Sequence, residues 1–230
     1  MKALILKEDN PSFEQFINNK GIDCLIHFTA TKNLYSILEN NKIMSRKMLE
    51  SLNVEQFDVL DYAQFTDDIR YDDTHYINLS ISFPNTFLFS KFREKTKDDI
   101  TITWCVLKID PIFLYVKDTL FSVTNAASNA AKYQYEISGD LNNLEMLFLP
   151  ELNINTYVGS RLLKRTENLK AKYPTDIQAE VLVKDEIPIE FIKSVCFYNE
   201  EDMACAKAAM SHLDLPECIV DKSLFSNNRI

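Results

Sequence analysis

The chain has 230 residues, of which 46% are hydrophobic and 26% are charged, and its formal net charge is −9. This length and composition are enough to bury the core of one domain, and we expect a single domain over residues 1–230. The net negative charge excludes a protein that binds polyanions through bulk charge alone.

The N-terminal part of the chain predicts a helix, a strand and a second helix. A short amphipathic helix is expected over 13–19, and Gly21 ends it because glycine is common just past a helix C-terminus. Residues 24–28 are typical of a strand, and the residues after them are typical of a helix. His27 therefore lies where a strand runs into a helix.

The middle of the chain alternates between strand patterns and irregular segments. Residues 75–83 alternate apolar with polar side chains, which predicts a strand, and 100–109 predicts another. A loop and a small helix are expected over 118–132. Residues 145–172 are strongly polar toward their end and predict helix or loop.

The C-terminal part predicts further strands around one helix. Residues 181–183 form a short apolar run that is typical of a buried strand, and 191–198 predicts the next one. Asn199 resembles a helix cap for residues 200–213. A short edge strand is expected within 218–225, and the whole order of elements indicates an α+β domain.

Several cofactor and membrane motifs are missing from the sequence. Its 3 glycines form neither a dinucleotide-binding G-x-G-x-x-G nor a phosphate-binding Gly-Lys loop. The 3 histidines lack zinc-ligand spacing, and the 5 cysteines include no C-x-x-C pair. No apolar stretch is long enough for a membrane span. We therefore expect a cytoplasmic protein that binds no metal and no membrane.

A carboxylate and an amide lie close together just before the apolar run 181–183. Strand geometry sends successive side chains to opposite faces, so we expect Gln178 and Glu180 to point the same way. Such a pair suits a site that holds sugar hydroxyls and steers a proton. The alternative is an edge strand whose polar face meets solvent.

Two basic clusters offer local sites for a nucleic acid, because cations beside aromatic rings can follow a strand and stack its bases. The first cluster contains Lys91, Arg93, Lys95 and Lys97, next to Phe87, Phe89 and Phe92. The second contains Arg161, Lys164, Arg165, Lys170 and Lys172. The alternative for both clusters is a solvated helix face.

Two terminal motifs and a middle segment together resemble a known family. The first motif is 25–29 with the helix residues 32–38, and the second is 178–183 followed by 187–199. Phe121 and residues 125–127 lie between them. In this order and spacing, the chain is similar to the DarT family of DNA ADP-ribosyltransferases, which are toxins of bacterial toxin-antitoxin and phage-defence systems.

The resemblance implies a fold and an activity. The fold would be ADP-ribosyltransferase-like, with two small packed and mostly antiparallel sheets flanked by helices. The enzyme would use NAD as co-substrate and modify a thymidine or guanosine base in single-stranded or locally opened DNA. An antitoxin protein would reverse the modification or bind the toxin.

The resemblance also implies roles for individual residues. They are catalytic Glu180 and Arg70, NAD-binding His27, Thr29, Asn33 and Gln178, and nucleic-acid-binding Arg161, Arg165 and Lys172. The block at 76–85 differs from better-known members, because it lacks their arginine, and this leaves the target base open. Arg70 is assigned by its place before that block.

Two other classes of function compete with this assignment. One is the same chemistry directed at RNA or protein. The other is a non-catalytic module that binds nucleic acid on the same scaffold. Transfer of label from NAD would distinguish an enzyme from a non-catalytic module. The identity of the labelled acceptor would show whether the enzyme acts on DNA, RNA or protein.

Overall fold

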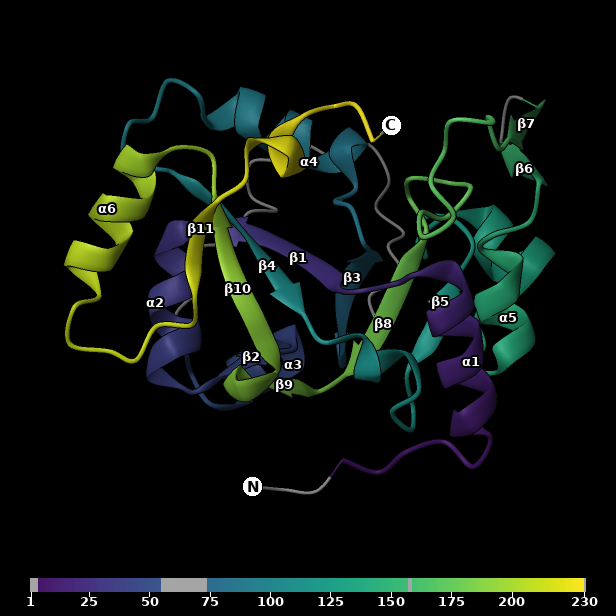
Figure 1. The fold of residues 1–230 in the computed structure, drawn as a ribbon, viewed down its shortest axis with the longest axis horizontal. Coiled ribbons are helices and arrows are strands. Elements are labelled where there is room, and N and C mark those ends of the chain that lie inside the picture. Colours follow the sequence, from purple (N-terminus) through teal and green to yellow (C-terminus); the bar gives the residue numbers. More distant parts are fainter. Residues whose placement is uncertain (1–3, 55–73, 157–158, 230) are drawn as a thin grey trace.

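The computed structural model of the protein describes residues 4–54, 74–156 and 159–229. Within these ranges, seven strands pair into one main sheet (Figure 1). Their order across the sheet is β11 (Cys218–Val220), β10 (Ile192–Phe197), β4 (Trp104–Ile109), β1 (Leu25–Ala30), β3 (Tyr76–Ile81), β8 (Glu180–Lys184) and β5 (Leu120–Ser122). Neighbouring strands are antiparallel, except β10 and β11, which run parallel.

The main sheet is divided in its middle. β1 pairs with β4 along its whole length, but it pairs with β3 only through Leu25 with Ile81 and Ile26 with Ser80. The groups β11-β10-β4-β1 and β3-β8-β5 are thus two smaller sheets joined by two residue pairs. This division agrees with the two mostly antiparallel sheets expected from the resemblance, and the α+β class is confirmed.

Two short ribbons complete the described strands. β2 (Lys42–Met44) pairs with β9 (Glu186–Pro188), and β6 (Glu151–Thr156) pairs with β7 (Gly159–Lys164). The β6-β7 hairpin lies where helix or loop was expected, so that prediction is wrong. Only β6 has a strand-like burial pattern, with Leu152 and Ile154 buried, whereas β7 is almost entirely exposed.

The α-helices in the described residues lie around the main sheet (Figure 1). They are α1 (Asn10–Lys20), α2 (Thr31–Glu39), α3 (Arg46–Ser51), α4 (Thr86–Thr96), α5 (Leu141–Met146) and α6 (Glu200–Ala209). As predicted, α1 ends at Gly21, which adopts φ 67°. The cap predicted for α6 is also confirmed, since the Asn199 side chain accepts a hydrogen bond from the Asp202 N–H at 2.7 Å.

Alternate residues of β1 enter two different cores, as strand geometry requires. Leu25 belongs to the larger core, and Ile26 belongs to a smaller aromatic core on α4. Phe89 and Phe92 are buried there, so these two rings of the first basic cluster are not available to stack on bases. Every helix in the described part of the chain is too short or too polar to span a bilayer.

Candidate active site

Glu180 is the first residue of β8, an interior strand of the main sheet. β8 pairs with β3 through Val181 and Leu79, and with β5 through Glu180 and Ser122. Only 8% of Glu180 is exposed. The alternative of a solvent-facing edge strand is therefore wrong, and Glu180 is a buried carboxylate.

Two groups hydrogen-bond to this carboxylate from opposite sides of β8. The backbone N–H of Ala126 donates to Oε2 at 2.8 Å, and the side-chain amide of Asn78 also hydrogen-bonds to it. Ala126 lies in the loop after β5, where the Asn125 side chain accepts from the Ala127 N–H at 2.8 Å. This turn within the loop precedes the helical segment 130–135 and presents a backbone donor to Glu180.

Burial raises the pKa of Glu180 to about 7. The hydrogen bonds from Ala126 and Asn78 favour the charged form and oppose this shift, while the nearby carboxylate of Asp176 adds to it. Near neutral pH the carboxylate is thus present in both its protonated and its ionised form. A group in this condition is suited to accept a proton during a reaction.

His27 lies on β1 at the point where β1 and β3 separate. Its Nδ1 is 3.3 Å from the carbonyl oxygen of Asn78. Because a carbonyl only accepts, Nδ1 carries the hydrogen, and burial lowers the pKa of the ring. The ring is therefore neutral at neutral pH, and its Nε2 is a hydrogen-bond acceptor.

Asn78 connects the two halves of this site and was not expected as a site residue. Its backbone carbonyl receives the hydrogen bond of His27, and its side chain contacts Glu180. It remains exposed, between the buried Ile77 and Leu79. The only signal in the sequence is a polar residue in an alternating strand, which is equally typical of a solvated face.

Replacing Asn78 by Ala is expected to raise the pKa of Glu180 further, because a hydrogen bond to the ionised form is lost. The midpoint of the pH dependence of catalysis should then move to higher pH. The profile of the rate against pH measures this. Asn155→Ala, at an exposed position of β6, is the control, and a midpoint that stays the same in both variants would contradict the contact.

Thr29 and Asn33 contact each other where β1 leads into α2. Thr29 is two residues beyond His27 on β1, and the Asn33 side-chain amide on α2 donates to its Oγ1 at 3.0 Å. Thr29 is buried and Asn33 is half-buried. Their assignment to NAD binding remains a prediction.

Gln178 lies in a turn rather than in the strand. Its backbone N–H donates to Asp176 Oδ1 at 2.9 Å, and β8 begins only at Glu180. The prediction that strand alternation directs Gln178 and Glu180 to one face is therefore wrong, because the Asp176 side chain turns the chain before the strand starts. Its role in NAD binding remains a prediction.

The three cations expected to bind nucleic acid have different environments. Arg161 on β7 is half exposed, and its guanidinium lies 3.7 Å from the Asp176 carboxylate. Arg165 donates to the backbone carbonyls of Tyr173 at 2.6 Å and Lys170 at 3.0 Å, so it holds the loop before β8 together. Lys172 lies in the same loop, forms an ion pair with Asp23 and is partly exposed.

Arg70 falls within 55–73, outside the described residues, so its catalytic role remains a prediction. In the residues that are described, no three His, Cys, Asp or Glu side chains come together to hold a metal. The described site thus consists of a buried carboxylate, a neutral imidazole and an amide between them.

Three solved structures share this fold. Thermus sp. 2.9 DarT in complex with ADP-ribosylated ssDNA has a TM-score of 0.55 and 11% identity over 90% of this chain and 97% of its own. Thermus sp. 2.9 DarT in complex with NAD+ has a TM-score of 0.51 and 13% identity over 88% of this chain and 96% of its own. Thermosipho africanus DarTG in complex with ADP-ribose has a TM-score of 0.54 and 18% identity over 88% of this chain. This chain spans only about half (51%) of that protein. No curated protein matches the sequence.

The chain shares the fold of these structures, and its described site has a buried glutamate and a neutral histidine joined through one asparagine. The family profile described as "ssDNA thymidine ADP-ribosyltransferase, DarT" matches residues 26–225. The chain belongs to the DarT family. This assignment confirms the predicted resemblance, the transferase class and NAD as co-substrate, and of the two expected bases it favours thymidine.

Proposed function

We propose that the chain transfers the ADP-ribosyl group of NAD to thymidine in single-stranded DNA, with Glu180 as the catalytic residue. The observation that supports this most is the environment of Glu180. Its carboxylate is 8% exposed, has a pKa raised to about 7, and is fixed by Ala126 and Asn78 beside His27.

The first task of Glu180 is to stabilise charge. When the bond between nicotinamide and C1′ of its ribose breaks, nicotinamide leaves with the bonding electrons and positive charge develops on the ribose. An ionised carboxylate beside C1′ stabilises this charge more than it stabilises the ground state. The N–H of Ala126 holds Glu180 in place, so little reorganisation is needed as the charge develops.

The second task is to remove a proton. N1 of thymine already carries the deoxyribose, so the ring nitrogen that bears a hydrogen is N3. As N3 forms its bond to C1′, it loses this proton, and the ionised Glu180 accepts it. A pKa of about 7 suits a base that works near neutral pH.

The N-terminal residues of the site would hold the dinucleotide. The Nε2 of neutral His27 accepts a hydrogen bond from a ribose hydroxyl, while Thr29, Asn33 and Gln178 lie along the same dinucleotide. The guanidinium of Arg70 would fix a phosphate or the acceptor base, since its planar donors match such groups.

The acceptor must be single-stranded or locally opened, because N3 of thymine is engaged with adenine in a duplex. We propose that Arg161 and Lys172 contact the phosphates of this strand, since both flank the segment that leads into Glu180. Arg165 contributes by shaping that segment through its bonds to the backbone of Lys170 and Tyr173.

Arg161→Gln is expected to weaken oligonucleotide binding and to reduce the slope of log K against log salt by about 1. Adding Lys172→Gln should reduce it by about 2 in total, because each side chain neutralises one phosphate. Binding of a labelled thymidine oligonucleotide over a range of salt concentrations measures the slope. Lys207→Gln, at an exposed position of α6, is the control, and equal slopes in all proteins would refute the assignment.

Incubation with labelled NAD tests the proposed activity as a whole. Separate pools of single-stranded DNA, duplex DNA, RNA and cell protein are offered as acceptors. We expect label in single-stranded DNA that contains thymidine and far less in the other pools. Label confined to protein or RNA would favour the alternative acceptor, and no transfer at all would favour a non-catalytic binding module.

In the cell we propose that the chain acts in the cytoplasm as a toxin or phage-defence effector. A modified N3 cannot pair with adenine, so replication of the marked strand is obstructed. We also propose an antitoxin protein that removes the modification or binds the chain. The DarTG protein of Thermosipho africanus, bound to ADP-ribose, supports this partner, because about half of it lies outside the match.

A further inference from the structure

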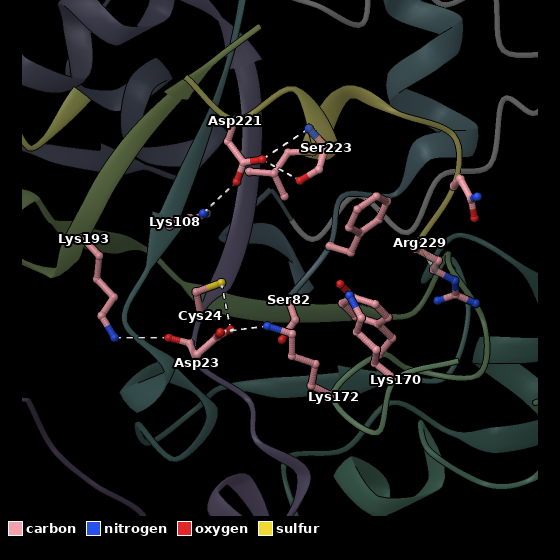
Figure 2. Close-up of a pocket in the computed structure, with 14 residues that line it drawn as sticks. Asp23, Cys24, Ser82, Lys108, Lys170, Lys172, Lys193, Asp221, Ser223 and Arg229 are labelled. Carbon is pink, nitrogen blue, oxygen red and sulfur yellow. Dashed lines mark hydrogen bonds and ion pairs between the residues drawn. The ribbon is translucent and has the colours of Figure 1, made fainter. Parts of the chain in front are cut away.

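A basic cavity of about 440 Å³ lies on one side of the main sheet, and its lining does not include Glu180, His27 or Asn78 (Figure 2). Its walls come from the residues before β1, the residues after β3, one side chain each of β4 and β10, the loop before β8 and the C-terminal segment. The residues lining it that matter here are Asp23, Ser82, Lys108, Lys170, Lys172, Lys193, Asp221 and Arg229.

Positive charge is in excess in this cavity. Five cations and two carboxylates line it, which gives a net charge of +3 in a chain whose net charge is −9. Each carboxylate has one close partner: Asp23 pairs with Lys172 at 2.8 Å, and Asp221 pairs with Lys108 at 3.0 Å. Of the other three cations, Lys193 lies 3.8 Å from the carboxylate of Asp110 outside the wall, whereas Lys170 and Arg229 form no ion pair among the described residues. A local excess of positive charge of this kind attracts an anion.

Ser82 adds a hydrogen-bonding group that points to a ligand. The residue is 5% exposed, and its Oγ has no hydrogen-bond partner among the described residues. A buried hydroxyl without a partner is unfavourable, because its hydrogen bonds to water are lost and not replaced. Its backbone adopts φ 60°, which is rare for a residue other than glycine, and its N–H is bound to the Cys24 carbonyl at 3.1 Å. Such a conformation is often found where a residue serves a ligand.

The cavity is adjacent to the catalytic strand pair. Ser82 follows the last residue of β3, four residues beyond Asn78, a distance of about 13 Å in extended chain. The loop that carries Lys170 runs directly into Glu180, and the guanidinium of Arg229 ties this loop down through the carbonyls of Pro174 at 2.8 Å and Thr175 at 2.9 Å. A nucleic acid strand that places a base at Glu180 therefore passes within reach of the cavity.

We propose that the cavity binds a backbone phosphate of the acceptor strand, beside the nucleotide that is modified. This inference rests on the proposed function. The ammonium group of Lys170 provides the charge, and the Ser82 hydroxyl donates to a phosphate oxygen. A phosphate of NAD has the same chemistry, but the residues assigned to NAD binding do not line the cavity.

Oligonucleotides with a single uncharged methylphosphonate, placed at successive positions around one thymidine, test the proposal. With the unmodified protein, one position should raise the KM for DNA about tenfold, as expected for loss of one charge-assisted contact. Lys170→Gln and Ser82→Ala should each raise the KM for the native oligonucleotide, and the methylphosphonate at that position should then add little. Lys207→Gln, outside the cavity, should behave as the unmodified protein does.

The KM for NAD distinguishes a phosphate of the DNA strand from a phosphate of NAD. It should remain unchanged in Lys170→Gln and in Ser82→Ala. A rise in the KM for NAD without a change in the KM for DNA would assign the cavity to the dinucleotide and overturn the proposal. Undiminished sensitivity to the methylphosphonate in both variants would also overturn it, while absence of transfer by the unmodified protein would instead contradict the proposed function.

Discussion

Replacing Glu180 by Gln is expected to lower the rate of transfer to a thymidine oligonucleotide by roughly 10² to 10⁴-fold. Glutamine has almost the same size, and its carbonyl oxygen still accepts from the Ala126 N–H. It carries no charge to stabilise the developing ribose cation, and it takes no proton from thymine. Mass spectrometry of the oligonucleotide at saturating NAD and DNA measures the rate.

The stability of the same variant is the control for its fold. The pKa of Glu180 is raised from 4.5 to about 7 by folding, so the folded state holds the proton more tightly than the unfolded state does. The free energy of unfolding should therefore fall, by roughly 3 kcal/mol, as pH rises from about 4.5 to 7. Glu180→Gln has no group that titrates at this position, so its free energy of unfolding should not fall in this way. The variant should be at least as stable as the unmodified protein at pH 8. Undiminished transfer by this folded variant would contradict the mechanism.

The rate of transfer is expected to fall about tenfold for each pH unit below 7 and to level off above it. Only the ionised form of Glu180 is active in both steps, and its pKa is about 7. Burial lowers the pKa of His27, so any transition of His27 lies at a lower pH than that of Glu180. The rate at low substrate concentration between pH 5 and 9 measures the profile.

The residual activity of Glu180→Gln provides the comparison for this profile. It should show no transition near pH 7, since the titrating group is absent. A transition that persists in this variant would assign the pH dependence to another group. A flat profile in the unmodified protein would mean that ionisation of Glu180 does not limit the reaction.

Much of the secondary structure near the site was predictable because its patterns are local. The apolar run 181–183 predicted a short buried strand, and the cap at Asn199 predicted the start of α6. The β6-β7 hairpin was not predictable in this way. Its stability comes from pairing two strands of which one is almost entirely solvent-exposed, so the second strand leaves no apolar pattern.

The assembly of the site depends on contacts that no local pattern contains. His27 and Glu180 lie on strands that are not neighbours, with β3 between them. The family resemblance placed both residues in one site, whereas spacing alone did not. The role of Asn78 could not be predicted, because it depends on β1 and β3 separating after two residue pairs and leaving a backbone carbonyl for His27. The pKa of Glu180 follows from burial, which requires the fold.

A crystal structure of Glu180→Gln with NAD and a short thymidine oligonucleotide tests the central claim most directly. The account predicts that C1′ of the nicotinamide ribose faces residue 180, that a ribose hydroxyl is bonded to Nε2 of His27, and that thymine N3 approaches the same carbon. A dinucleotide bound away from Asn78, or one that contacts either His27 or residue 180 but not both, would contradict it.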